Sequence, residues 1–127
     1  MSLIDVEPDT QNMARLPIAP VVTYLQDTLD QTLTAYLSGV DDATQVGHWA
    51  QGEAEPHAMI SVRLRAAASA VQYLMAAYDA DTAKAWLIGT NTRLDGDAPA
   101  RRLRQAATHD QCQFLVPVAR AFAGGLA

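Results

Sequence analysis

Apolar side chains recur at helical spacing along two long stretches of the chain. Between Val21 and Leu37 they lie three or four residues apart, which predicts one helix, or two helices joined at a bend, ending at Gly39. A longer stripe from His57 to Tyr78 predicts a helix of about 33 Å, since the rise is about 1.5 Å per residue. The stripe consists of Ile60, Leu64, Ala67, Val71, Leu74 and Tyr78.

Shorter elements fill the rest of the pattern. Asp41 or Asp42 is expected to cap a short helix that ends at Ala50, and a helix, a turn at glycine and a second short helix form a helix corner. Towards the C-terminus, helices are predicted over 81–88, 99–106 and 111–123, with a loop over 89–98. We expect Asp81 to cap the helix over 81–88 and Asp110 to cap the helix over 111–123. Pro99 suits the first turn of the helix over 99–106, and Pro117 starts or bends the last helix.

Composition favours an all-α fold. Half of the 127 residues are hydrophobic, much of that share is alanine, and only 6% are aromatic, which suits close helix packing better than a sheet. The length fits one domain, or two small helical units that share a core. Residues 1–20 contain three prolines and no sustained period, so we expect a flexible arm that adds little to the core.

Charge is divided unevenly between the two halves of the chain. Residues 1–60 carry nine acidic side chains and one basic one, whereas residues 61–127 carry five acidic and eight basic ones. The single cysteine, Cys112, excludes an internal disulfide and a multi-cysteine zinc site, and it is expected to be a small buried residue. Without a signal-peptide pattern or a membrane-length apolar run, we expect a cytoplasmic protein with no membrane partner.

The segment 31–52 resembles the helix-turn-helix of Xre/Cro-type regulators. A small residue, Ala35, lies four positions before the turn glycine, Gly39, with Val40 next and a W-x-x-G pattern at Trp49 and Gly52. If this unit reads DNA, the base-contacting side chains would be Thr44, Gln45 and His48. Positive charge would then come from Arg63 and Arg65, or from a second subunit. The alternative is a corner that packs without touching DNA, since Asp41 and Asp42 would repel a duplex.

The segment 85–103 is similar to the C-terminal toxin-binding domain of Xre/MbcA/ParS-type antitoxins. The similarity rests on Trp86, Leu87, Asn91, Leu94, Gly96 and Pro99, and it continues at Leu103, Val118 and Gly124. It implies an N-terminal arm (1–20), a helix-turn-helix unit (21–56), a long connecting helix (57–80) and a toxin-binding domain (81–127). It further implies an antitoxin that covers the active site of a cognate toxin, of the RES-domain NAD-consuming or ADP-ribosyl-transferring type, and that often represses its own operon.

The resemblance divides the chain's notable residues into partner contacts and structural positions. The expected toxin contacts are Asn91, Arg93, Leu94, Arg101, Arg102 and Arg104. The expected structural positions are Ala35, Gly39, Trp49, Trp86, Gly96 and Pro99. Two alternatives stay open, because Asn91 can instead bond its own backbone and the arginines can form a solvated face.

Catalysis is not expected from this sequence. The three histidines are scattered without metal-ligand spacing, and there is no P-loop, G-x-G-x-x-G or G-x-S-x-G pattern, so no cofactor or metal is expected. Two rival functions remain, namely a DNA-binding regulator without a toxin partner and an antitoxin-derived interaction protein that no longer binds DNA. The alanines of the long helix, Ala66, Ala67, Ala68 and Ala70, would suit either a homodimer contact or burial within one chain.

Overall fold

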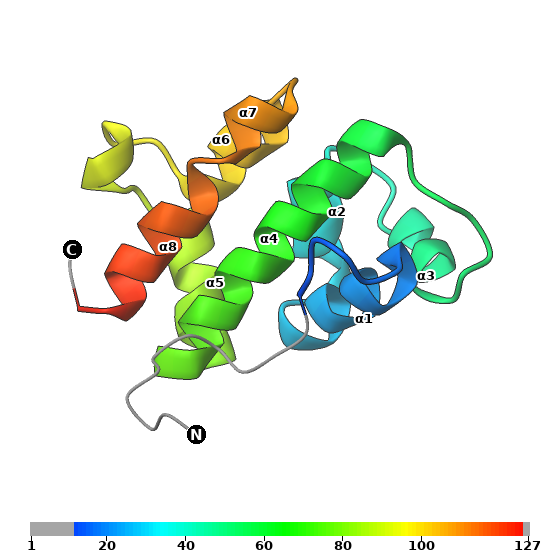
Figure 1. The fold of residues 1–127 in the computed structure, drawn as a ribbon, viewed down its shortest axis with the longest axis horizontal. Helices are drawn as coiled ribbons and strands as arrows, with labels where there is room; N and C mark the ends of the chain where they lie inside the picture. The colour runs from blue at the N-terminus through cyan, green and yellow to red at the C-terminus, as the bar shows by residue number, and fades with distance from the viewer. Residues whose placement is uncertain (1–11, 126–127) are drawn as a thin grey trace.

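The computed structural model describes residues 12–125, and over these residues the chain is helical with no strand. The elements are α1 (Ile18–Thr28), α2 (Gln31–Ser38), α3 (Thr44–Ala50), α4 (Ala58–Ala77), α5 (Ala80–Ile88), the 3₁₀ turn η1 (Thr92–Leu94), α6 (Pro99–Gln105), α7 (His109–Cys112) and α8 (Leu115–Ala123) (Figure 1). The all-α prediction is confirmed for this part of the chain.

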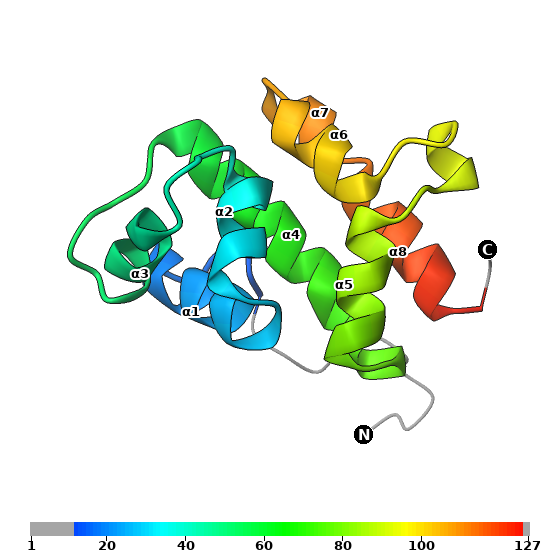
Figure 2. The ribbon, with the colours of Figure 1, turned by 180° about the vertical axis from the view of Figure 1, so that it is seen from behind.

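The long helix α4 is the axis of the molecule. It packs against α1 and α2 from the first half of the chain and against α5, α7 and α8 from the second half (Figures 1 and 2). Its expected stripe is buried from Leu64 to Leu74, with Leu64, Val71 and Leu74 wholly inaccessible, whereas Ile60 is half-buried and Tyr78, at the C-cap, is 40% exposed. Ala67, Ala68 and Ala70 are also fully buried. These three alanines are therefore buried within a single chain, so they cannot form a homodimer contact.

The stretch 21–37 forms two helices rather than one. The chain breaks at Asp30, whose side chain accepts a hydrogen bond from the Leu33 N–H at 2.6 Å and so caps α2. At the other end of α2, Gly39 takes the left-handed conformation with φ of 99°. Ala35 and Trp49 are buried on either side of this turn. A left-handed residue at Gly39 thus ends α2, and the short helix α3 follows it.

Two of the expected helix caps are wrong by two residues. Asp79, not Asp81, caps α5 by accepting from the Thr82 N–H. Thr108, not Asp110, caps α7 by accepting from the Gln111 N–H, and a separate helix, α8, begins at Leu115. At α3 the N-cap position is Ala43, but the expected Asp42 carboxylate accepts from the Thr44 N–H at the start of the helix, at 2.9 Å. Acidic and hydroxyl residues crowd each of these turns, so only the backbone path selects the one that caps.

The expectation of a flexible arm over residues 1–20 is wrong for residues 12–20, whereas residues 1–11 lie outside the described part of the chain. Met13 is only 5% exposed and α1 begins at Ile18. The Arg65 guanidinium donates to the carbonyls of Met13 and Leu16, at 3.0 and 2.6 Å. This segment belongs to a single hydrophobic cluster that reaches from Met13 to Ala119. One shared core therefore holds both sides of α4 together.

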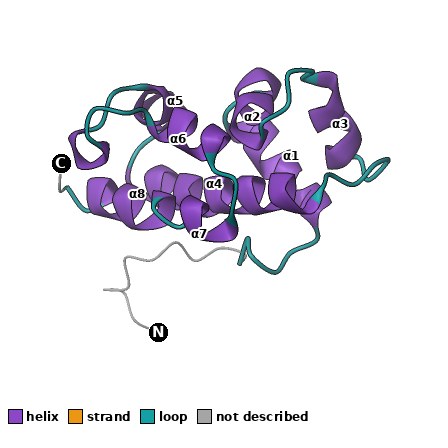
Figure 3. Ribbon diagram, turned by 90° about the horizontal axis from the view of Figure 1, so that it is seen from above, coloured by secondary structure: helices purple, strands orange, loops and turns teal. Residues whose placement is uncertain are grey.

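Figure 3 shows how the molecule is layered around α4. Helices α2, α5 and α6 lie on one side of α4, and α7 lies on the opposite side. None of the helices within residues 12–125 combines the length and the apolar character that crossing a membrane requires.

Candidate protein-binding groove

Two polar side chains of α3, Thr44 and His48, are bound to carboxylates that flank the helix. Thr44, Gln45 and His48 are all exposed on this helix. The hydroxyl and backbone N–H of Thr44 donate to Asp42, at 2.7 and 2.9 Å, and hold the pKa of that carboxyl below its ordinary value. His48 Nδ1 lies 2.7 Å from Glu53 Oε1. The expected recognition helix is therefore flanked by carboxylates, whereas a DNA-reading helix is usually flanked by cations.

Arg63 does not reach this face, because its guanidinium is bound inside the molecule. It donates to the Ser38 carbonyl at 2.9 Å and twice to the Ala106 carbonyl, at 2.8 and 3.1 Å. A Cβ added at Gly39 would stand 2.9 Å from this guanidinium. Arg63 is thus a bridge between the end of α2 and the end of α6, not the DNA-contacting cation that the sequence suggested.

Arg104 also turns inward, towards the C-terminal end of α2. It donates to the carbonyls of Tyr36 and Val40, at 2.9 and 3.3 Å, and to the Asp41 carboxylate at 2.8 Å. Its guanidinium stands 4.8 Å from the centre of the Tyr36 ring. Carbonyls at a helix C-terminus lack intrahelical partners and attract cations. The uneven charge of the two halves is therefore partly matched within the chain, and Arg104 is not a free partner contact.

The loop 89–98 is organised by Asn91. Its side chain accepts from the Arg93 N–H at 2.9 Å, and its carbonyl accepts from the N–H groups of Leu94 and Gly96. Gly96 has a φ of 84°, which a side chain rarely allows. Leu94 is only 3% exposed, so its side chain cannot be the toxin contact suggested by the sequence. Of the two uses considered for Asn91, bonding its own loop is the one observed.

Trp86 and Pro99 hold the ends of this loop. Trp86 is buried in α5, with its ring centroid 6.0 Å from that of Phe122. Pro99 is buried at the first turn of α6, where its missing N–H is not needed. Arg93, in η1, lies on the exposed side of the loop. Most of the residues that carry the family resemblance are therefore engaged in forming the loop 89–98 and its two ends.

Arg101 and Arg102 share one carboxylate. Both donate to Asp97, at 3.3 and 3.4 Å. Partial desolvation raises the pKa of Asp97, but the Ala98 N–H and the two arginines outweigh it and keep that pKa below its ordinary value. Arg102 also donates to the Leu94 carbonyl, whereas the Arg101 side chain is 62% exposed. Two cations thus face one anion, and the unmatched positive charge lies at Arg101.

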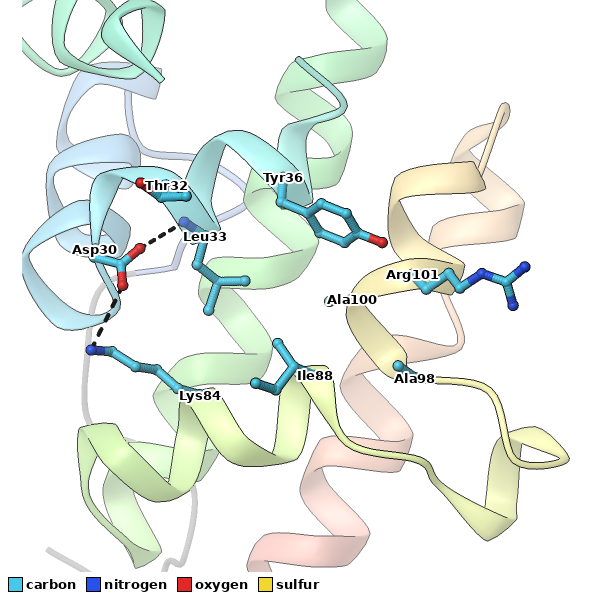
Figure 4. Close-up of a pocket in the computed structure, with 9 residues that line it drawn as sticks. All are labelled: Asp30, Thr32, Leu33, Tyr36, Lys84, Ile88, Ala98, Ala100 and Arg101. Atoms are coloured by element: carbon cyan, nitrogen blue, oxygen red, sulfur yellow. Dashed lines mark hydrogen bonds and ion pairs between the residues drawn. The ribbon is translucent and has the colours of Figure 1, made fainter. Parts of the chain in front are cut away.

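A groove of about 550 Å³ opens between α2, α5 and α6 (Figure 4). Tyr36 and Ile88 point into it from opposite sides, with exposed fractions of 38% and 63%. The apolar lining consists of Leu33, Tyr36, Ile88, Ala98 and Ala100. Polar and charged side chains form its rim, namely Asp30, Thr32, Lys84 and Arg101. The groove therefore has the apolar centre and charged edge of a docking surface.

Sequence reasoning missed most of this groove. The sequence pattern predicts Tyr36 within the apolar positions of 21–37 and Ile88 at the end of the helix over 81–88, and of the lining residues it indicates only Arg101 as a contact. The one sequence feature that indicates an exposed apolar surface here is the apolar residue Ile88 at the last position of α5, where the helix meets a polar loop.

Cys112 is buried between α7 and the core. Burial raises the pKa of the Cys112 thiol, and the charge of Arg63 opposes that shift only in part. In residues 12–125, no three histidine, cysteine, aspartate or glutamate side chains are grouped so that they could hold a metal ion.

Comparison with known proteins returned no relative. No protein-family model matches the chain, and no curated protein or solved structure is significantly similar to it.

Proposed function

We propose that this protein is an antitoxin-type binding protein that neutralises a cognate toxin by covering its active site, without catalysis or a cofactor of its own. The observation that carries the proposal is the groove between α2, α5 and α6, where Tyr36 and Ile88 expose apolar surface inside a charged rim. The class of toxin, an NAD-consuming RES-domain or ADP-ribosyl-transferring enzyme of the cytoplasm, rests on the sequence resemblance alone.

Protein binding fits the geometry better than DNA binding. The groove joins α2 of the helix corner to α5 and α6 of the C-terminal half, so both parts of the chain would contact one partner. The outer face of α3 instead carries Asp42 and a histidine paired with Glu53, and Arg63 is bound elsewhere. A transcriptional regulator without a toxin partner is therefore the weaker alternative, because a duplex needs cations at its phosphates.

Co-expression with the product of the adjacent gene tests the proposal. We expect that gene to arrest growth when expressed alone, this chain to restore growth, and the two proteins to elute together in size-exclusion chromatography with light scattering. The same masses would show whether this chain enters the complex as a homodimer. A neighbour that is harmless, or one that still kills without forming a complex, would contradict the proposed function. A complex with a harmless partner would favour the antitoxin-derived interaction protein instead.

A further inference from the structure

We infer that the groove between α2, α5 and α6 receives an acidic amphipathic helix of the partner, with aliphatic side chains on Tyr36 and Ile88 and a carboxylate beside Arg101. This inference rests on the proposed function and deepens it, since it names the partner chemistry that the groove selects.

The partner segment is inferred to be helical because the groove offers no backbone pairing. Its walls are the three helices α2, α5 and α6, and no strand occurs within residues 12–125 that could supply a sheet edge. An extended segment on the apolar lining would leave its own N–H and C=O groups without partners, whereas a helix satisfies them internally. Ala98 and Ala100 line the α6 side, and small side chains let a helix approach closely.

The charge at the rim specifies an acidic partner. At one end, the Asp30 carboxylate is satisfied twice, by the Leu33 N–H at 2.6 Å and by Lys84 Nζ at 3.8 Å. At the other end, Arg101 shares Asp97 with Arg102 and remains 62% exposed. The first end is neutral and the second carries an unmatched positive charge. A carboxylate on the partner would complete the second end, whereas a partner cation would be repelled there.

Paired substitutions at Ile88 separate the apolar contribution from the sign of the partner's charge. Ile88 is the last residue of α5 and is 63% exposed, so Ile88→Glu and Ile88→Lys should both fold. Against the immobilised product of the adjacent gene, measured by surface plasmon resonance, we expect Ile88→Glu to weaken binding about 100-fold and Ile88→Lys about tenfold. Met75→Glu is the matched control, because Met75 is exposed but does not line the groove, and it should bind within about twofold of wild type.

Arg101 tests the proposed carboxylate directly. We expect Arg101→Glu to weaken binding more than tenfold and to flatten its salt dependence, and Arg101→Lys to stay within about threefold, since the charge is kept. Hydrogen exchange on the partner should protect one helical segment with apolar residues three and four apart and acidic residues beside them.

Several results would overturn the inference. Equal losses for Ile88→Glu and Ile88→Lys would show that the partner surface is not acidic. Protection of a basic or non-helical segment would exclude the helix. Unchanged affinity of every groove variant would show that the partner binds elsewhere, and the proposed function would survive. Wild-type protein that does not bind at all would remove both proposals together. Melting curves of each variant, within a few degrees of wild type, confirm that folding is not the cause.

Discussion

Replacement of Arg104 by alanine should destabilise the fold through the end of α2, where this side chain joins the two halves of the molecule. Its guanidinium donates to the carbonyls of Tyr36 and Val40 and stacks 4.8 Å from the Tyr36 ring centre. Hydrogen bonds from a charged donor contribute about 1.5–3 kcal/mol when well made, and an exposed cation–π contact about 0.5–1 kcal/mol. Since the longer bond is 3.3 Å and the side chain is 25% exposed, we expect a combined loss of about 2 kcal/mol.

The ion pair with Asp41 should contribute little to this loss. The Asp41 side chain is 98% exposed, so water and salt screen its attraction to Arg104. Asp41→Ala is therefore expected to cost less than about 0.5 kcal/mol. For a chain of this length, Arg104→Ala should lower the melting temperature by about 8 °C, and Asp41→Ala by no more than about 2 °C.

Urea unfolding followed by circular dichroism at the helical band measures both free energies of unfolding. Arg104→Lys provides a further comparison, because an ammonium keeps the charge but cannot reach two carbonyls and a ring in the same way. If Arg104→Ala cost less than about 0.5 kcal/mol, or if Asp41→Ala cost as much as Arg104→Ala, the carbonyl contacts would not be the stabilising interaction.

Three further predictions concern other parts of the fold. Gly39→Ala should lower the free energy of unfolding in urea by about 2 kcal/mol, because φ is 99° and the new Cβ would lie 2.9 Å from the Arg63 guanidinium. Gly52→Ala, with φ of 75° and open space around it, should lower that free energy by only about 1 kcal/mol; equal losses would contradict the close approach at Gly39. The N–H and hydroxyl of Thr82 hold the pKa of Asp79 below its ordinary value of 3.8, so the contribution of Asp79 to stability should be complete above that value and lost as pH falls through the lower folded pKa. An NMR titration midpoint at or above 3.8 would contradict this. Fluorescence anisotropy at about 50 mM salt should show no sequence-specific binding of wild-type protein to a DNA duplex from upstream of the gene. The Asp41→Lys/Asp42→Lys double variant should gain salt-sensitive DNA binding. Tight, steeply salt-dependent binding by the wild type would contradict the claim that carboxylates near α3 repel DNA.

Local features of the sequence predicted much of the helical framework. The stripe of α4, the turn at Gly39 and the start of α6 at Pro99 depend on spacing and backbone preference within a few residues, and all three occur as expected. The helix caps could not be located to the residue, because Asp79 and Asp81 both stand at the start of α5 and only the chain path decides between them.

The roles of the arginines and the groove could not be read from spacing. Arg104 bonds to Tyr36 across 68 positions of sequence, and Arg63 to Ala106 across 43, so their partners depend on how the two halves dock. Exposure of Ile88 depends in the same way on where α5 ends relative to α2 and α6. A charge count correctly located the basic half of the chain, but the fold uses most of those cations to hold itself together.

Hydrogen exchange of this chain, free and bound to the product of the adjacent gene, tests most directly the claim that the groove is the binding surface. The account predicts added protection in α2, α5 and α6, the helices that line the groove, and no change in α3. Protection confined to α3, or no change in any of the three groove helices when the complex is formed, would contradict it.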